Sequence, residues 1–370
     1  MKKIFIFVFM TLTGLGLWIF NEHVSTCLAK NNSFNLTGVQ SITPAEVRGL
    51  NFIQSKLQNP NWIIHYSTSF RGSSNNSVVE SMGQMMEYLA MTGDSKLFEK
   101  YAKVTDEYFL DKKGYYYWEI NARTKKPEQV TASIDDLRIF KAYYIAHQKN
   151  MGDYSKKLNQ LASLIYKFDV DKNNYLTSYY FGKNGGKGRE LYTFYLDAET
   201  LKKLAQIDKK WQTPLETTIG IIRNLPENQF GFYPRNFKTD TKEYIWDDSI
   251  NMVENLYTGL FAQAAGKDVS KFTEFLKQQV AKGNVFNLYH RNEGIPVDNN
   301  ESAAVYALAT RFLNTAGEQE AADFCYERTL WFQIGEDNLF YGGFGEEETG
   351  LVYAFDQLEA LLMLRMVENE

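Results

Sequence analysis

A repeat of about 55 residues constrains this 370-residue chain more than any other feature of its sequence. An aromatic turn rich in Asp, Asn and Gly recurs five times, with aromatic positions at Tyr115, Tyr175, Phe232, Phe286 and Phe340. Successive turns are thus separated by roughly 54–60 residues, which indicates a fold built from similar units, each packed on its neighbours.

Acidic residues at the starts of helical stretches recur in step with these turns. They are Glu80, Asp136, Asp197, Asp248, Glu301 and Asp356. Successive acids are separated by roughly 51–61 residues, so the two series share one period. Acids are favoured in the first turn of any helix because they offset its dipole, so the series alone does not indicate catalysis. Each of these acids also follows an aromatic loop or apolar residues, and we expect them to converge.

Between these positions the apolar residues recur with the spacing of helices. The first full hairpin shows it well, since its inner stretch runs from Val78 to Leu89 and ends at Thr92-Gly93. The pattern predicts helices near 44–58, 78–92, 95–110, 133–150, 153–169, 195–207, 212–224, 248–265, 269–283, 300–315, 318–332 and 351–367. These twelve helices make six hairpins.

Six consecutive helical hairpins can stack as an open solenoid or close into a ring. A solenoid repeat is usually shorter and does not need a long aromatic turn. We therefore expect an all-α chain, an (α/α)6 barrel with short β-hairpin loops. Its inner helices would begin at one mouth, where the acids would meet and the aromatic turns would form the wall.

The N-terminus indicates export. Lys2-Lys3 precedes an apolar run over 4–20, which is typical of a signal peptide or signal anchor. Cleavage after Ala29 and lipidation at Cys27 are both open alternatives. We expect residues 1–34 to be a signal or anchor with a linker, and 35–370 to be a single domain. The protein is then secreted or held at the cell surface, and it meets the membrane only through this segment.

Charge and composition exclude several classes of function. Forty Lys and Arg against 45 Asp and Glu give a net charge of -5, which does not favour nucleic acid. The four histidines do not occur at metal-ligand spacing and are His23, His65, His147 and His290. We expect no metal and no cofactor, and a monomer that binds a polysaccharide.

The segment Val79–Ala90 resembles the signature of glycoside hydrolase family 8, which reads SEGxGYGMLLA followed by GD and LF. Gly93-Asp94 and Leu97-Phe98 follow here in the same order. The resemblance implies that Glu80 is the general acid. Met82 and Gln84 depart from the pattern.

A second segment, Thr131–Ile139, is similar to the family's ATDGDLDIA motif and aligns Asp136 with its second Asp. Carboxylates of this motif bind the sugar at the cleavage subsite. Ile134 occupies the position of the first Asp, so Asp135 shares the expected role. Trp118, on the preceding aromatic loop, is similar in placement to a Trp that stacks on substrate.

A third segment, Trp246–Met252, resembles the family's YDAxRxP motif, whose Asp is the general base. Aligning that Asp with Asp248 puts Asn251 on the Arg, whereas aligning it with Asp247 puts Ile250 there. We prefer Asp248 because an apolar residue is a poor substitute for Arg, and the choice stays open. Glu80 and Asp248 lie three repeats apart, which favours a wide, inverting arrangement.

The resemblance covers about residues 40–368, and the chain is most similar to the PssZ-type hydrolases encoded beside Gram-positive exopolysaccharide genes. It implies an endo-acting, inverting glycoside hydrolase that cleaves an exopolysaccharide. In the best-known case this polymer is based on N-acetylmannosamine. The expected role is biofilm dispersal or trimming of the polymer. Aromatic and polar side chains complete the predicted site. We expect Tyr195 and Trp246 to stack on sugar rings, and Arg235 and Asn251 to form hydrogen bonds with sugar hydroxyl groups.

Two other classes of function stay open at this point. A barrel that keeps the sugar groove without cutting would be a glycan-binding protein of an export system. A lyase acting on uronic acids would use Tyr with His or Arg, and the scarcity of His argues against it.

Overall fold

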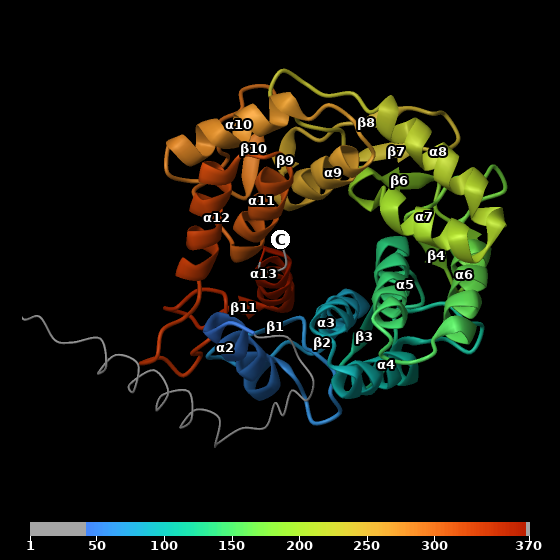
Figure 1. The fold of residues 1–370 in the computed structure, drawn as a ribbon, viewed down its shortest axis with the longest axis horizontal. Helices are drawn as coiled ribbons and strands as arrows, with labels where there is room; N and C mark the ends of the chain where they lie inside the picture. The colour runs from blue at the N-terminus through green and yellow to red at the C-terminus, as the bar shows by residue number, and fades with distance from the viewer. Residues whose placement is uncertain (1–41, 368–370) are drawn as a thin grey trace, which may run out of the picture. The chain divides into compact units, whose positions relative to one another are not determined.

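Twelve α-helices alternate between an inner and an outer ring in this computed structural model, which describes residues 42–367 (Figure 1). The inner helices are α3 (Val79–Thr92), α5 (Ser133–Gln148), α7 (Ala198–Ile207), α9 (Met252–Ala264), α11 (Ala303–Thr315) and α13 (Ala354–Val367). The outer helices are α2 (Pro44–Phe52), α4 (Ser95–Phe109), α6 (Ser155–Asp169), α8 (Gln212–Arg223), α10 (Ser270–Ala281) and α12 (Gln319–Trp331). Three single turns join them: the π-helix η1 (Ile53–Leu57) and the 3-10 helices η2 (Thr193–Tyr195) and η3 (Lys209–Trp211).

The inner ring is closed. Each inner helix contacts the next in chain order, and α13 returns to contact α3. This closure confirms the predicted (α/α)6 barrel and excludes the open solenoid.

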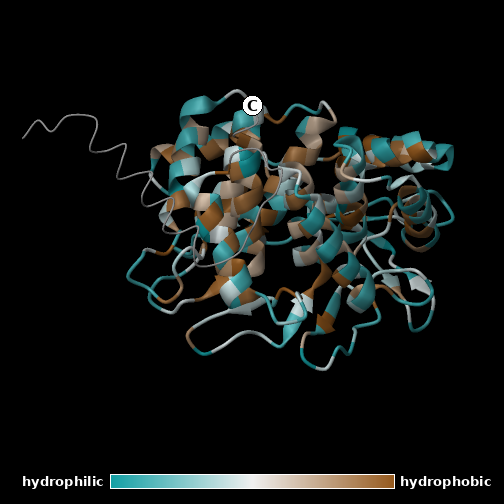
Figure 2. Ribbon diagram, turned by 60° about the horizontal axis from the view of Figure 1, so that its bottom comes forward, coloured by the Kyte–Doolittle hydropathy of each residue, from teal (hydrophilic) through white to brown (hydrophobic). Residues whose placement is uncertain are grey.

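The two rings differ in how far their helices are buried. Helix α4 has one buried face, on which Phe98, Tyr101, Thr105 and Phe109 recur three or four residues apart. Helix α3 is buried over nearly its whole surface because α4, α5 and α13 pack around it. Figure 2 shows apolar and hydrophilic residues side by side on the helices, and many hydrophilic residues along the long loops.

The strands are short, and most join neighbouring repeats. They are β1 (Ser67–Thr68), β2 (Asn76–Val78), β3 (Glu119–Asn121), β4 (Tyr180–Phe181), β5 (Gly186–Lys187), β6 (Glu190–Tyr192), β7 (Asn236–Lys238), β8 (Tyr244–Ile245), β9 (Ser249–Asn251), β10 (Leu288–His290) and β11 (Val352–Tyr353). The antiparallel pairs are β1–β11, β2–β3, β4–β5, β6–β7, β7–β8 and β9–β10. Strand β9 occupies 249–251, so α9 begins four residues later than the sequence pattern predicts.

Rings of the repeated aromatic turns pack beside the helices rather than all lining the mouth as expected, although Trp118 of the first turn is exposed. In four of the five turns an Asn or Asp side chain accepts a backbone N–H two residues ahead, at 2.7–2.9 Å: Asp111, Asp171, Asn228 and Asn338. This is an Asx turn. The aromatic rings that follow are buried at Tyr115, Phe232 and Phe340, and they fill the space beside the helices.

The first and last helices complete the ring through a buried ion pair. Arg365 on α13 donates from Nη2 to the Glu46 carboxylate of α2 at 2.6 Å, and the Tyr88 hydroxyl donates to the same carboxylate at 2.9 Å. Both charged side chains are inaccessible to solvent. The predicted signal or anchor over 1–34 lies outside the described residues. Between residues 42 and 367, none of the helices has the length and apolar character needed to cross a membrane.

Candidate active site

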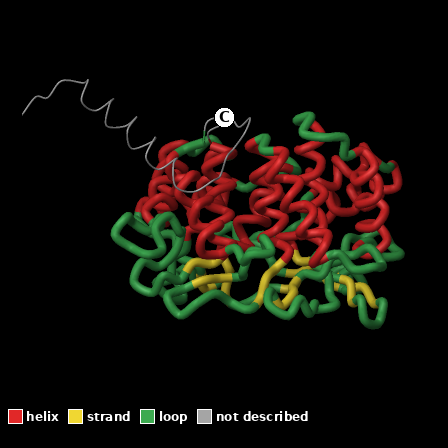
Figure 3. Tube along the Cα trace, turned by 90° about the horizontal axis from the view of Figure 1, so that it is seen from below, coloured by secondary structure: helices red, strands yellow, loops and turns green. Residues whose placement is uncertain are grey.

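The inner helices begin at one end of the barrel, which we call the mouth. Figure 3 shows the helices on one side and the strands and long loops gathered on the other, at the mouth. Glu80 is the second residue of α3. The preceding N–H, of Val79, donates to the Trp118 carbonyl at 2.9 Å, and β2 pairs with β3, so the loop carrying Trp118 is fixed beside this helix start. The Trp118 side chain is 37% exposed, so its ring is open to a ligand.

Glu80 shares one guanidinium nitrogen with Asp135. Nη1 of Arg138 donates to Glu80 Oε1 at 3.0 Å and lies 3.6 Å from Asp135 Oδ1. The Glu80 side chain is 29% exposed, whereas those of Asp135 and Arg138 are almost fully buried. Burial raises the pKa of Asp135 well above its usual range, and the charge of Glu80 adds to this while Arg138 opposes it. Asp135 therefore favours the protonated form.

Asp136 points elsewhere. Its carboxyl group is buried and faces Asp169, and Thr131 donates to Asp169 Oδ1 at 3.3 Å. Burial first, and the charge of Asp169 second, raise the pKa of Asp136 well above its usual range. Of the two adjacent acids, Asp135 is the one beside Glu80.

Tyr195 joins the Glu80 side of the mouth to the rest of the site. Burial raises the pKa of its hydroxyl, and the charges of Asp135 and Glu80 raise it further. The Tyr195 ring contacts Phe194 and Tyr192 edge-on, with ring centroids 4.9 and 5.2 Å away. Phe194 and Tyr192 stack on each other at 5.1 Å with nearly parallel planes.

Beyond these rings lies a crevice between η2, the loop at 233–235 and the start of α9. Arg235 forms a bidentate ion pair with Glu254 at 2.8 and 2.9 Å, and Asp247 Oδ2 lies 3.6 Å from Nε of the same arginine. The residues that line the crevice are Thr193, Phe194, Tyr233, Pro234, Arg235, Asp247, Ser249, Ile250, Asn251, Glu254, Asn255 and Thr258. Arg235 thus lies in the crevice, but its Nε and Nη2 atoms already donate hydrogen bonds to Glu254. Asn251 uses Oδ1 to cap α9, accepting the N–H of Val253 at 3.0 Å.

Asp248 lies outside this crevice. Its side chain is fully exposed, and Oδ1 lies 3.7 Å from Nη2 of Arg291. The Arg291 guanidinium also stacks over Trp246 at 5.8 Å from the ring centroid. Of these two adjacent acids, Asp247 is the one that lines the crevice.

Two exposed tyrosines at the mouth were not singled out as site residues from the sequence. Tyr66 and Tyr353 are 45% and 40% exposed, and their rings meet edge-on at 5.7 Å. Burial raises the pKa of the Tyr66 hydroxyl, and the charges of Tyr353 and Glu80 add to this. The Tyr66 N–H donates to the Asn76 carbonyl at 2.8 Å, on the strand β2 that leads into α3. The β1–β11 pairing brings the two tyrosines together from distant parts of the sequence, so no local pattern reveals the pair.

The recurring acids do not all converge at the mouth as expected. Asp197 caps α7 by accepting the N–H of Thr200 at 2.9 Å. Asp356 accepts the N–H of Ala304 at the start of α11, and Glu301 pairs with Arg328 at 3.0 Å. These three serve helix starts and packing, which is the role that helix dipoles favour.

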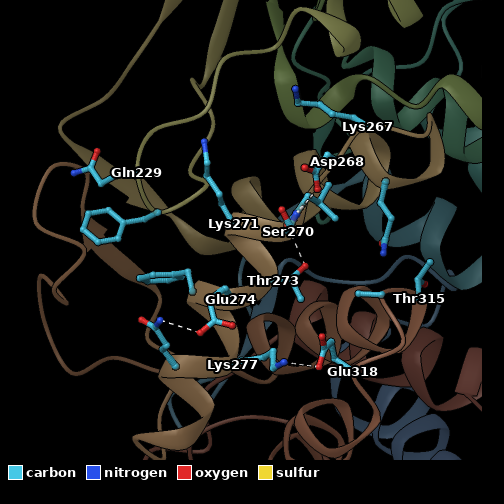
Figure 4. Close-up of a pocket in the computed structure, with 16 residues that line it drawn as sticks. Gln229, Lys267, Asp268, Ser270, Lys271, Thr273, Glu274, Lys277, Thr315 and Glu318 are labelled. Carbon is cyan, nitrogen blue, oxygen red and sulfur yellow. Dashed lines mark hydrogen bonds and ion pairs between the residues drawn. The ribbon is translucent and has the colours of Figure 1, made fainter.

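A larger depression lies outside the ring, between α10 and the ends of α9 and α11 (Figure 4). Its volume is about 990 Å³, and two of its lysines are paired, Lys277 with Glu318 at 2.7 Å and Lys271 with Glu227 at 2.8 Å. It contains none of the predicted site residues, so the smaller crevice at the mouth is the better candidate. Among residues 42–367, no group of three or more His, Cys, Asp or Glu side chains is arranged to hold a metal ion.

No protein-family model matches the sequence. A curated relative, the "putative lipoprotein YdaJ" of Bacillus subtilis (strain 168), is 27% identical over 347 residues, which cover 92% of this chain and 91% of that protein.

Solved structures share the fold along most of the chain. An alpha-amylase from Clostridium perfringens is 27% identical, with a TM-score of 0.79 over 87% of this chain and 97% of that one. PssZ from Listeria monocytogenes is 22% identical, with a TM-score of 0.70 over 88% and 97%. The endoglucanase Cel10 from Klebsiella pneumoniae, a family 8 glycosyl hydrolase, is 14% identical, with a TM-score of 0.64 over 87% and 99%. The chain therefore has a divergent form of the (α/α)6 barrel that family 8 glycoside hydrolases adopt.

Proposed function

We propose that this protein is an exported, endo-acting glycoside hydrolase that cleaves a bacterial exopolysaccharide with inversion of configuration. The observation that carries the proposal is the partly exposed Glu80 carboxylate at the mouth, held by Arg138 beside the buried carboxyl group of Asp135. A carboxyl group at this position can protonate a leaving oxygen. The name of the lipoprotein relative supports export, and the sequence resemblance to PssZ-type hydrolases implies an exopolysaccharide substrate, such as one based on N-acetylmannosamine.

The second carboxylate in the proposal is Asp247. It enters the mouth from the loop before α9, three inner helices around the ring from α3. A base that activates water must sit on the far side of the sugar from the acid, with roughly 6.5–9.5 Å between the carboxyl groups. Arg235, 3.6 Å from Asp247, keeps that side chain oriented. Asp135 and Tyr195 would contact the sugar between the two, and Trp118, Tyr66 and Tyr353 would stack on neighbouring rings.

The decisive experiment measures new reducing ends from exopolysaccharide of the source organism, with the wild type beside Glu80→Gln. We expect release by the wild type and a loss of at least about 100-fold in the variant, because a positioned general acid contributes 10²–10⁴-fold. Full activity of Glu80→Gln would contradict the assignment. Starch is tested in parallel because the alpha-amylase neighbour supports an alternative, an α-glucan substrate.

A glycan-binding barrel that does not cut is the second candidate. The specific observation in its favour is the ion pair of Glu80 with Arg138 at 3.0 Å, because it holds the carboxylate as a fixed hydrogen-bond acceptor for a sugar hydroxyl group. Tight binding of the polymer without any new reducing ends would establish this candidate.

A further inference from the structure

A chain of hydrogen bonds runs from Glu80 through the core of the barrel. Arg138 donates from Nη1 to Glu80 and from Nη2 to the Tyr257 hydroxyl, at 3.0 Å in both cases. The Tyr257 hydroxyl in turn donates to Oε1 of Glu359. Arg138 and Tyr257 are both buried, so the chain is shielded from solvent below Glu80.

Glu359 anchors the far end of this chain. It is fully buried, and it accepts from Nε2 of Gln84 at 2.7 Å and from Nη1 of Arg311 at 3.0 Å. We call the connected set the inner network: Glu80, Gln84, Asp135, Arg138, Tyr257, Arg311 and Glu359. Its members come from α3, α5, α9, α11 and α13, so the network ties five inner helices together beneath the mouth.

The charges of the inner network balance only with a bound proton. It holds three carboxyl groups, Glu80, Asp135 and Glu359, against two guanidinium groups, Arg138 and Arg311. Uncompensated charge is costly in a buried site, so the neutral state is the one with a single proton on a carboxyl group. Glu359 is paired with Arg311 and hydrogen-bonded twice more, which leaves the proton to Glu80 and Asp135.

We propose that Arg138, Tyr257 and Glu359 are positioning residues that hold Glu80 and Asp135 on one guanidinium nitrogen, so that this pair shares a single proton. The inference rests on the proposed function, since it describes how Glu80 is supplied with the proton that a general acid needs. Both carboxyl groups contact Nη1 of Arg138, at 3.0 Å for Glu80 and 3.6 Å for Asp135, so a proton on one removes a charge beside the other. Burial and the charge of Glu80 raise the pKa of Asp135, which agrees with a proton held by the pair.

Other charged and titratable groups lie around the inner network. They are Tyr66 before β1, Glu119 on β3, Glu87 on α3, Asp136 and Lys141 on α5, Tyr195 on η2 and Asp356 on α13. Glu87 and Lys141 pair with each other at 2.6 Å, so they add no net charge. None of these groups connects Glu80 to Glu359 by hydrogen bonds, whereas Arg138 and Tyr257 do.

The test compares two variants that each remove one buried tyrosine hydroxyl. Tyr257→Phe breaks the link between Arg138 and Glu359. Tyr88→Phe is the matched control, because Tyr88 also donates to a carboxylate paired with a buried arginine, in the Glu46–Arg365 cluster. We expect similar thermal stability for both variants. We expect Tyr257→Phe alone to lower kcat by about tenfold at unchanged KM, and to shift the basic limb of its pH profile.

A second variant, Arg138→Lys, tests whether the guanidinium group must contact Glu80 and Tyr257 together. A lysine keeps the charge but cannot hold Glu80 and Tyr257 at once. We expect it to lower kcat, and the double variant with Tyr257→Phe to be no worse than Arg138→Lys alone. Equal kcat and equal pH profiles for Tyr257→Phe and Tyr88→Phe, with an active wild type, would overturn the positioning role.

A spectroscopic measurement separates this inference from the proposed function. The wild type should show the infrared C=O band of a protonated carboxyl group at neutral pH, and Asp135→Asn and Tyr257→Phe should each remove or shift that band. This readout needs no turnover. An inactive wild type with the band present would contradict the proposed function alone, whereas a band unaffected by both variants would contradict the inner-network proposal.

Discussion

Asp247 turns its carboxylate toward Arg235, with 3.6 Å between Oδ2 and Nε, while the next residue turns away from the crevice toward Arg291. We therefore expect Asp247→Asn to lower kcat by about 100-fold or more, since it removes the group that would activate water. Asp248→Asn should change kcat by less than about threefold, because its exposed pair with Arg291 contributes little. Initial rates of reducing-end release measure both. The reverse order of the two effects would return the base to Asp248.

The exposed aromatic side chains at the mouth should contribute to substrate affinity rather than to the chemical step. We expect Trp118→Ala and Tyr66→Ala each to raise KM by about tenfold, which is about 1.4 kcal/mol, with little change in kcat. Trp331→Ala is the control, because Trp331 is 68% exposed on the outer helix α12. Steady-state kinetics on the purified polymer would measure the effect. If Trp331→Ala raised KM as much as Trp118→Ala and Tyr66→Ala do, the aromatic side chains at the mouth would have no specific role in substrate binding.

Asp169 should make stability depend on pH. Burial raises its pKa to about 7, so the folded state binds this proton more tightly than the unfolded chain does. The contribution of Asp169 to the free energy of unfolding therefore falls as pH rises from about 4 to about 7. Asp169→Asn removes this dependence. The free energy of unfolding of the variant minus that of the wild type should therefore be larger at pH 8 than at pH 5, and it should grow by at most about 1.4 kcal/mol per pH unit.

Urea unfolding at the two pH values would show this difference. The exposed Asp323→Asn on α12 serves as the control and should track the wild type at both. An Asp169→Asn curve that parallels the wild type across this range would contradict the raised pKa.

The buried pair of Glu46 and Arg365 should be essential to the stability of the closed ring. Arg365→Met leaves the Glu46 carboxylate without its charged partner in a fully buried site. We expect a loss of about 3–5 kcal/mol in the free energy of unfolding. Lys271→Met breaks an exposed pair with Glu227 and should cost less than about 1 kcal/mol. Restoration of stability in the double variant Glu46→Met with Arg365→Met would show that the unpaired charge causes the loss.

The helical framework could be predicted from the sequence because its signals are local. The end of α3 at Gly93 is an example, since φ of 85° there requires a left-handed residue and glycine supplies it. Apolar residues recur at helix spacing within each hairpin, and the regular period of the repeat then fixes the number of hairpins. Six hairpins could also stack as an open solenoid, so the closed ring was predicted from the length of the repeat and its aromatic turn rather than from the number of hairpins alone.

The site residues were harder to predict because their roles depend on the direction in which each side chain points. Adjacent residues on a helix point about 100° apart, and adjacent residues in extended chain point to opposite sides. The choice between Asp135 and Asp136, and between Asp247 and Asp248, therefore turns on a one-residue shift that a degenerate motif does not resolve. The Tyr66–Tyr353 contact depends on segments far apart in the sequence, so only the assembled barrel reveals it.

The contacts that close the ring also set when this protein can fold. Arg365 and Glu46 are 319 residues apart in sequence, and β1 pairs with β11 across a similar span. Closing a loop of that length costs conformational entropy, and folds dominated by such distant contacts form slowly. Helix α13 is also the last of the twelve helices to leave the ribosome. The barrel is thus completed only once that helix has emerged, and until then the nascent chain remains an unclosed arc with its inner helices partly uncovered.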